Sequence, residues 1–173
     1  MTLRLGEILV QQNVLSDQQL EAILAEQERG GGPFGLLAEQ LFGVDPETIE
    51  NAWAEQYTRI ARTVDPAGEA FEQPAIDLVS RRQAWQFRVL PIRFEDGVLM
   101  IATMPDALRR ALRFATRVID VPCYFVMAEP DQLGLALCKH YPLPGLTPLC
   151  VRDQGLDRLL GLSGDRSQQS EVA

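Results

Sequence analysis

Lysine, histidine and cysteine are scarce in this sequence. Of its 16 basic residues only Lys139 is a lysine, and the chain carries a formal net charge of -8. An acidic chain whose arginines are spread along its length repels a polyphosphate backbone, so we expect no nucleic acid polymer as a partner. The sequence also lacks the Gly-x-x-x-x-Gly-Lys-[Ser/Thr] loop. This absence excludes ATP hydrolysis by a P-loop mechanism.

The cysteines suggest neither disulfides nor a metal site. Cys123, Cys138 and Cys150 stand at irregular spacings, and the only histidine, His140, lies two residues after Cys138. An odd number of cysteines in such a pattern predicts reduced thiols and no bound metal. On a helix, Cys138 and His140 would point about 200° apart. No pair of residues with catalytic spacing stands out, so we predict a protein that is not an enzyme.

Long apolar runs are missing as well. No stretch approaches the roughly 18 residues of a membrane span. Glu7 interrupts the N-terminal stretch MTLRLGEILV, which is too short for the apolar core of a signal peptide. The composition, 46% hydrophobic and 23% charged, is that of a globular protein. We therefore expect a cytoplasmic protein with no direct membrane insertion.

An internal repeat fills the first third of the chain. At a shift of 29 residues, RLGEILVQQNVLSDQQLEAILAEQ (4–27) aligns with PFGLLAEQLFGVDPETIENAWAEQ (33–56). Gly6 aligns with Gly35, and both copies end in Ala-Glu-Gln. Self-similarity at a fixed shift indicates two copies of one structural unit.

Each copy predicts two helices joined by a tight turn. Ser16 and Asp45 occupy equivalent positions and are favoured helix N-caps. Asn13 and Gly43, just before them, suit the left-handed conformation that ends a helix. The second helix of each copy carries apolar residues at helical spacing, which predicts a stripe facing the core. The stripe comprises Leu20, Ile23, Leu24 and Gln27 in one copy and Ile49, Ala52, Trp53 and Gln56 in the other.

The pattern changes after residue 63. Residues 80–87 predict a short capped helix, and two apolar strands flank Asp96-Gly97, a strong hairpin signal. A helix from Pro105, a strand in VPCYFVM and a helix from Pro130 to His140 follow.

We therefore predict an α+β fold with four segments. Residues 1–63 form an N-terminal four-helix subdomain of two tandem helical hairpins, and residues 64–79 form a connector without periodicity. Residues 80–141 form a small three-stranded α/β sandwich subdomain. Residues 142–173 form a partly disordered C-terminal tail, with an amphipathic turn at Leu156, Leu159 and Leu160.

These features resemble the N-terminal domain of the type II secretion and type IV pilus assembly ATPases, the GspE and PilB type. Its MshEN-like, cyclic di-GMP-binding version has two 24-residue motifs separated by five residues, the spacing of this repeat. The motif begins Arg-Leu-Gly and ends in Gln after regularly placed aliphatic residues. The matching residues are Arg4, Leu5, Gly6, Leu9, Val10, Leu15, Leu20, Leu24 and Gln27. Two later segments are also similar to that domain, LPIRFEDGVLMIATMPDAL and ALCKHY. The resemblance therefore covers about residues 3–141.

The resemblance implies a non-catalytic regulatory or docking module whose partner is a secretion or pilus platform protein or ATPase. The alternative it implies is a cyclic di-GMP receptor that binds through the tandem motifs. No other cofactor is expected. The candidate contacts for the dinucleotide are Arg4, Leu5, Gly6, Leu9, Gln27, Gly35 and Gln56.

The second copy departs from the ligand-binding pattern. Pro33 stands where that version often has Arg, Ala38 and Glu39 replace two aliphatic residues, and Phe42 replaces a Gly. An arginine fork on a guanine edge contributes about 1–3 kcal/mol, so its loss is expected to weaken binding about tenfold to a hundredfold. Another interpretation stays open, in which Arg4 is solvated and Gly6 permits only a close helix contact.

Overall fold

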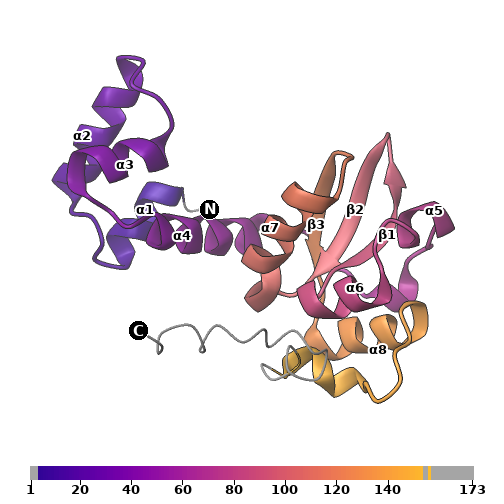
Figure 1. Cartoon of the computed structure of the whole chain (residues 1–173). Helices are drawn as coiled ribbons and strands as arrows, with labels where there is room; N and C mark the ends of the chain where they lie inside the picture. Colours follow the sequence, from indigo (N-terminus) through magenta and orange to yellow (C-terminus); the bar gives the residue numbers. More distant parts are fainter. Residues whose placement is uncertain (1–3, 154–155, 157–173) are drawn as a thin grey trace, which may run out of the picture. The chain divides into compact units, whose positions relative to one another are not determined.

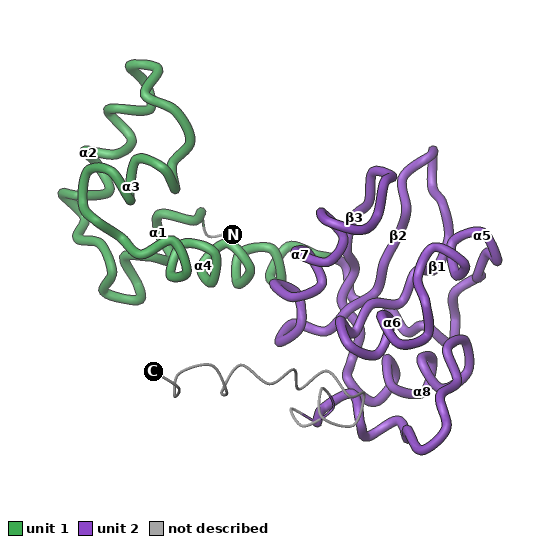
Figure 2. Tube along the Cα trace, in the orientation of Figure 1, with its two compact units in different colours: residues 1–61 green, residues 62–173 purple. Residues whose placement is uncertain are grey.

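The computed structural model describes residues 4–153 and Leu156. The chain forms two compact units, residues 1–61 and residues 62–173, which we call unit 1 and unit 2 (Figure 2). Unit 1 is helical, and unit 2 combines a sheet with helices (Figure 1). The predicted α+β fold class is confirmed.

Unit 1 consists of four helices, α1 (Leu5–Gln11), α2 (Asp17–Glu28), α3 (Phe34–Phe42) and α4 (Pro46–Ile60). Helix α1 packs on α2 and α4, and α3 packs on the same two helices. Each helix therefore contacts the other helix of its own copy and one helix of the other copy. This arrangement confirms the two tandem helical hairpins.

Local interactions specify the two turns. The Ser16 hydroxyl accepts a hydrogen bond from the Gln19 amide at 3.2 Å, and the Gln19 side chain accepts one from the Ser16 amide at 2.8 Å. The Asp45 carboxylate caps α4 through the Thr48 amide at 3.2 Å. Asn13 and Gly43 adopt the left-handed conformation, with φ of 58° and 64°. The predicted caps and helix ends are confirmed.

Unit 2 contains a three-stranded sheet in the order β1-β2-β3. Strands β1 (Leu90–Glu95) and β2 (Val98–Thr103) are antiparallel and joined at Asp96 and Gly97, which both have positive φ. Strand β3 (Cys123–Met127) runs parallel to β2. A parallel pair needs a crossover, which helix α7 (Leu108–Val118) supplies after the short 3-10 helix η2 (Pro105–Ala107).

The segment predicted as a connector, residues 64–79, is ordered within unit 2. It holds η1 (Pro66–Gly68) and α5 (Gln73–Ile76), and α5 lies against β1 (Figure 1). The Val64 amide donates to the Met127 carbonyl at 2.8 Å, and the Glu72 amide donates to the Ile92 carbonyl at 2.8 Å. These long-range bonds, which leave no periodic trace in the sequence, replace the expected linker.

Buried aromatic groups tie the helices of unit 2 together. Helices α6 (Arg81–Phe87) and α8 (Pro130–His140) meet where Trp85, which is fully buried, donates from Nε1 to the Tyr141 carbonyl at 2.8 Å. The Tyr141 hydroxyl donates to the Ile76 carbonyl at 2.8 Å. Burial raises the pKa of this hydroxyl, which stays protonated and keeps donating.

The region predicted as a tail begins with an ordered element, η3 (Pro148–Arg152), which packs on α8. Leu156 is fully buried, whereas Leu159 and Leu160 lie outside the described residues. Between residues 4 and 153, no helix combines the length and the apolar character that crossing a membrane requires.

Candidate functional site

The buried core of unit 1 reproduces the sequence repeat. Its eight buried residues form four pairs, each pair related by the shift of 29 residues. Residues of the first copy thus meet their counterparts from the second copy in one core. The pairs are Ile8 with Leu37, Leu9 with Ala38, Leu15 with Val44, and Ile23 with Ala52.

The predicted core stripe is partly wrong. Ile23 and Ala52 are fully buried, but Leu24 is 41% exposed and Trp53 is only half-buried, with its ring 5.3 Å from that of Tyr57. The residue after each buried position points about 100° further round the helix and is less buried. Leu24 therefore belongs to the outer surface of unit 1, whereas its equivalent Trp53 is partly covered.

The two motif glycines occupy equivalent close contacts. A Cβ at Gly6 would overlap the Leu20 side chain and come within 3.0 Å of the Phe34 ring. A Cβ at Gly35 would come within 3.0 Å of Ile49, the counterpart of Leu20. Each glycine therefore lets the first helix of its copy approach the second. Gly6 thus makes a close helix contact, and a contact between Gly6 and a ligand stays a prediction.

Arg4 and Leu5 stand at the start of α1. Arg4 is exposed, and its amide donates to the Glu7 carboxylate at 2.7 Å. Leu5 is half-buried at the edge of the core, whereas Leu9 is 0% exposed inside it. The Arg4 guanidinium can thus reach a ligand from solvent. Leu9 can only support such a site from beneath.

The two motif glutamines end their copies on α2 and α4. Gln27 is half-buried, and its amide donates to the Gly32 carbonyl in the spacer at 3.3 Å. Gln56 is half-buried on α4. The Gln27 bond holds the spacer against the end of α2, so this amide has a structural partner in addition to any ligand.

Phe34 is a residue that our sequence analysis did not select. Its ring lies beside Gly6, so the start of α3 meets the start of α1. The repeat carried a signal for it, because Phe34 is the counterpart of the motif residue Leu5. The structure therefore brings together Gly6, Leu20 and Phe34 at the first copy, and Gly35 and Ile49 at the second.

Two departures of the second copy can be placed in the structure. Ala38 is fully buried and belongs to the same core as its counterpart Leu9, so the second copy contributes the smaller side chain to that core. Pro33 caps α3 with φ -64° and ψ 143°, close to the conformation of Arg4 at the start of α1. Position 33 thus has the same backbone geometry as position 4 but offers no guanidinium.

Unit 2 carries a polar cluster on its sheet. Arg93 on β1 pairs with Glu69 at 2.5 Å and with Glu95 at 2.6 Å, and the Tyr124 hydroxyl donates to Glu95. The bonds from Tyr124 and then Arg93 lower the pKa of the Glu95 carboxyl, while burial and the Glu95 contact raise the pKa of Tyr124. Each group has a strong partner, and this satisfied network is typical of a structural cluster.

Cys138 and His140, which we considered as a metal pair, both lie on α8. Over residues 4–153, no three His, Cys, Asp or Glu side chains gather in a way that could hold a metal ion. The three cysteines are half-buried free thiols, and burial raises the pKa of Cys123 and Cys138. The His140 ring stacks on Phe71 with centroids 3.9 Å apart. Its role in the described structure is packing.

Comparisons with known proteins give a consistent set of relatives. A family model described as the MshEN domain matches residues 58–145, just over half of the chain. The match covers the end of α4 and the sheet of unit 2, so the candidate residues from Arg4 to Gln56 lie outside it. The type IV pilus assembly ATPase PilB of Thermus thermophilus is 26% identical over 140 residues. That alignment covers 81% of this chain but 15% of PilB.

Two solved structures are also similar. A structure of MshE with cyclic di-GMP (cdg) has a TM-score of 0.45 and 26% identity, and the match covers 80% of this chain and 99% of that one. The N-terminal domain of XpsE has a TM-score of 0.39 and 21% identity, and covers 79% of this chain and 97% of its own.

Proposed function

Because this chain belongs to the MshEN domain family, we propose that it is a non-catalytic regulatory domain that docks on a protein of the type II secretion or type IV pilus machinery. The observation that carries the proposal is the position of the family match, which falls on the mixed α/β unit. The partner we expect is a platform protein or an assembly ATPase, met in the cytoplasm.

The outer side of α8 supports docking through unit 2. Leu135 is 61% exposed and borders a hollow of about 230 Å³. Pro66, Ala67 and Ala136 give this hollow apolar walls, and its lining also carries one acidic and one basic residue, Asp65 and Lys139. An exposed apolar side chain beside an apolar hollow offers a surface on which a partner side chain can pack.

Retention of candidate partners on the immobilised chain tests this proposal. The cytoplasmic part of the platform protein and the assembly ATPase from the same organism would be passed over wild type, Leu135→Asp and Val118→Asp. Val118 is 49% exposed on α7 and serves as the matched control. We expect wild type and Val118→Asp to retain one of the two proteins, and Leu135→Asp to bind at least about tenfold less. The proposal fails if wild type retains neither.

We also propose a second candidate function, binding of cyclic di-GMP by unit 1. The observation that favours it is the paired geometry of the two copies, since a ligand with two guanines and two phosphates suits a site built from two equivalent halves. Gly6 and Gly35 occupy equivalent positions, and Arg4 is exposed at the start of α1. Its guanidinium suits a guanine edge or a phosphate. Only one such guanidinium exists, because Pro33 occupies the counterpart position.

Calorimetric titration with cyclic di-GMP separates this function from docking. Arg4→Ala is expected to weaken binding by about tenfold or more, whereas Arg29→Ala removes the same charge from the exposed spacer and should leave affinity nearly unchanged. Pro33→Arg supplies the second guanidinium and should strengthen binding about tenfold to a hundredfold. No heat with either wild type or Pro33→Arg at high micromolar ligand would contradict a dinucleotide site.

A further inference from the structure

Helix α8 and the 3-10 helix η3 of unit 2 lie in close contact and run in opposite directions. A Cβ at Gly134 of α8 would overlap the carbonyl of Pro148, the first residue of η3. At the other end of η3, Arg152 donates from Nε to the Asp131 carboxylate at 3.2 Å. The start of η3 thus meets the later position on α8, and its end meets the earlier one.

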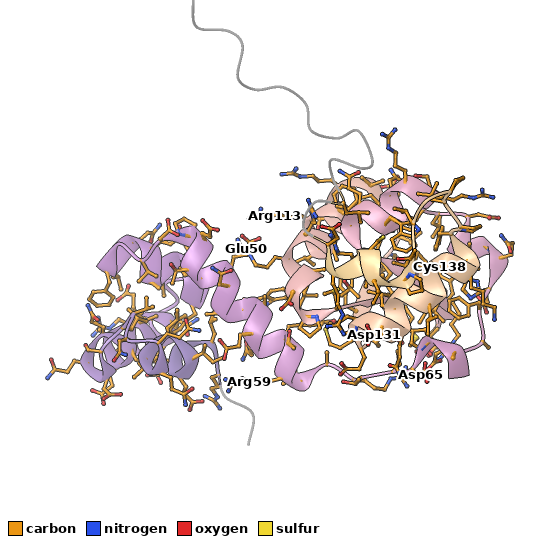
Figure 3. All side chains as sticks on the ribbon, turned by 90° about the horizontal axis from the view of Figure 1, so that it is seen from below. Glu50, Arg59, Asp65, Arg113, Asp131 and Cys138 are labelled. Carbon is orange, nitrogen blue, oxygen red and sulfur yellow. The ribbon has the colours of Figure 1, made fainter. Side chains whose placement is uncertain are left out.

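Two of the three cysteines belong to this contact. Asp131 and Cys138, both labelled in Figure 3, lie three residues before and four residues after Gly134 on α8. This i, i+3, i+7 spacing places all three residues on the side of α8 that meets η3. Cys150 lies within η3. Both cysteines are free and half-buried, so part of each is open to solvent.

The side chain of Cys150 is directed toward the end of the contact where Cys138 lies. The Thr147 amide donates to Cys150 Sγ at 3.4 Å, and Thr147 Oγ1 lies 3.5 Å from the same sulfur. Thr147 precedes η3, and Cys138 lies one turn beyond Gly134, the position that the start of η3 meets. The antiparallel packing therefore brings the two thiols to the same end of the contact.

Electrostatics distinguishes these two cysteines from the third. Burial and then the neighbouring Cys150 raise the pKa of Cys138. Burial alone raises the pKa of Cys123, which starts β3. Cys138 and Cys150 are thus close enough to influence each other, and Cys123 provides a half-buried thiol for comparison.

We propose that Cys138 and Cys150 form a redox-active pair, which closes to a disulfide by exchange with a small-molecule disulfide such as oxidised glutathione. The Cys150 thiolate, whose sulfur accepts the Thr147 amide bond, attacks one sulfur of the oxidant and releases one glutathione thiolate. The Cys138 thiolate then attacks the Cys150 sulfur, forms the bond between the two residues and releases the second glutathione thiolate.

This exchange is balanced without any further reactant. The protein loses two electrons and the two thiol protons, and the oxidant is reduced to two molecules of glutathione, which take up those protons. We expect the pair to be reduced in an ordinary cytoplasmic glutathione pool and to close when that pool becomes oxidised. The bond would tie η3 to α8 across residues 139–149. Neither cysteine lines the hollow proposed for docking, so the pair does not depend on that proposal.

Incubation of the full chain in glutathione buffers of increasing oxidised fraction tests the pair. The remaining thiols are alkylated, and the tryptic peptides are identified by mass spectrometry. Trypsin cuts after the sole lysine, Lys139, which separates Cys150 from the peptide 118–139 that holds the other two cysteines. In Cys123→Ser, a bond between the two peptides within one chain therefore identifies the proposed pair. We expect this bond in Cys123→Ser to the same extent as in wild type.

The single substitutions separate a pair from independent thiols. Cys138→Ser and Cys150→Ser should each stop at a mixed disulfide with glutathione, because the second thiol is missing. At the glutathione ratio that links half of the wild-type chains, Cys123 should carry glutathione in at least about tenfold fewer chains, because it has no second thiol at high effective concentration. Hydrogen exchange of oxidised wild type, which needs no substitution, should slow in residues 140–152 and stay unchanged in β1 and β2.

The proposal is overturned if Cys138 and Cys150 carry only glutathione, if oxidation links Cys123 instead, or if the bond joins two chains. Each of these results leaves the docking and cyclic di-GMP tests unaffected, because neither test involves a cysteine.

Discussion

In unit 1 four buried residues of one hairpin meet their four counterparts from the other hairpin. In unit 2 single polar groups join segments that are far apart in the sequence. Trp85 donates to the Tyr141 carbonyl across 56 residues, and Arg88 donates to the Val151 carbonyl across 63. The first unit therefore depends on a small repeated apolar core, and the second on long-range contacts around a sheet.

This difference leads to different expectations for stability. A helical unit of about 60 residues buries a smaller fraction of its surface than a larger one and is marginal by itself. Unit 2 has more buried apolar residues than unit 1, and it also has a fully buried polar residue, Thr103. We expect unit 1 to be the less stable unit. Hydrogen exchange read by mass spectrometry resolves the two units and provides the measurement for the first two predictions.

The largest effect is expected from Ile23→Ala in unit 1. Ile23 is fully buried, and deleting such a side chain costs about 2–5 kcal/mol through lost burial and the cavity left behind. Exchange should accelerate throughout residues 4–60 and stay unchanged in β1–β3. Leu24→Ala is the control, since Leu24 is 41% exposed and its removal should change stability by about 0.5 kcal/mol or less. Equal effects of the two substitutions would contradict the assignment of the core face.

The next largest effect is expected from Gly134→Ala in unit 2, which adds a methyl group instead of removing a side chain. A Cβ at Gly134 would overlap the Pro148 carbonyl, so α8 and η3 must separate, at a cost of about 1–3 kcal/mol. Exchange should accelerate in α8 and η3 and not in unit 1. Gly68→Ala meets no atom within 4 Å and should leave exchange unchanged. Faster exchange in unit 1 after Gly134→Ala would show that the two units are not independent.

The helix caps provide a matched pair across the two units. Ser16 and Ser80 form the same capping box, with Gln19 and Gln83 respectively. Replacing either serine by alanine should remove about 1 kcal/mol. The melting temperature of unit 1 should fall by about 4–8 °C, and that of the larger unit 2 by less, because the entropy of unfolding scales with size. Calorimetric scans of both variants check this, and a larger shift for Ser80→Ala would reverse the proposed order of stability.

The predictable parts of the fold are those that neighbouring residues specify. Ser16, Asp45 and Ser80 start helices through their own side chains, and Asp96-Gly97 makes the hairpin. α5 was missed because its position is held by a long-range bond, from the Glu72 amide to the Ile92 carbonyl. Its sequence carries no helical period, so only the tertiary structure reveals it.

The candidate site was predictable to the extent that the repeat determines it. The equivalence of Gly6 and Gly35 followed from alignment, and both make the same kind of close contact. The sequence could not show whether Ile23 or Leu24 is the core position, because both lie on one apolar face. The packing of the other helices decides which of them is buried. The contacts of Arg88 with backbone carbonyls were also hidden, since any residue supplies a carbonyl.

The smallest predicted effect is a loss of stability at acidic pH, which we expect in unit 2 but not in unit 1. His140 is the only histidine in the chain and lies in unit 2, where burial and then Lys139 lower its pKa below the ordinary value of 6.5. The unfolded chain therefore takes up the proton first as the pH falls. Stability of unit 2 should be fully present above pH 6.5 and should decline as the pH falls through the lowered pKa, while unit 1, without histidine, lacks this contribution.

NMR titration of the single imidazole, together with melting curves at about pH 7 and about pH 5.5, measures this dependence. The imidazole should titrate below pH 6.5, and His140→Gln should reduce the loss of stability on acidification in unit 2. The stacked Phe71 ring supplies the reason, since it covers one face of the imidazole and keeps water from the charged form. Phe71→Ala should therefore raise the imidazole pKa toward 6.5. A pKa that starts above 6.5, or one that does not move in Phe71→Ala, would exclude burial against this ring as the cause.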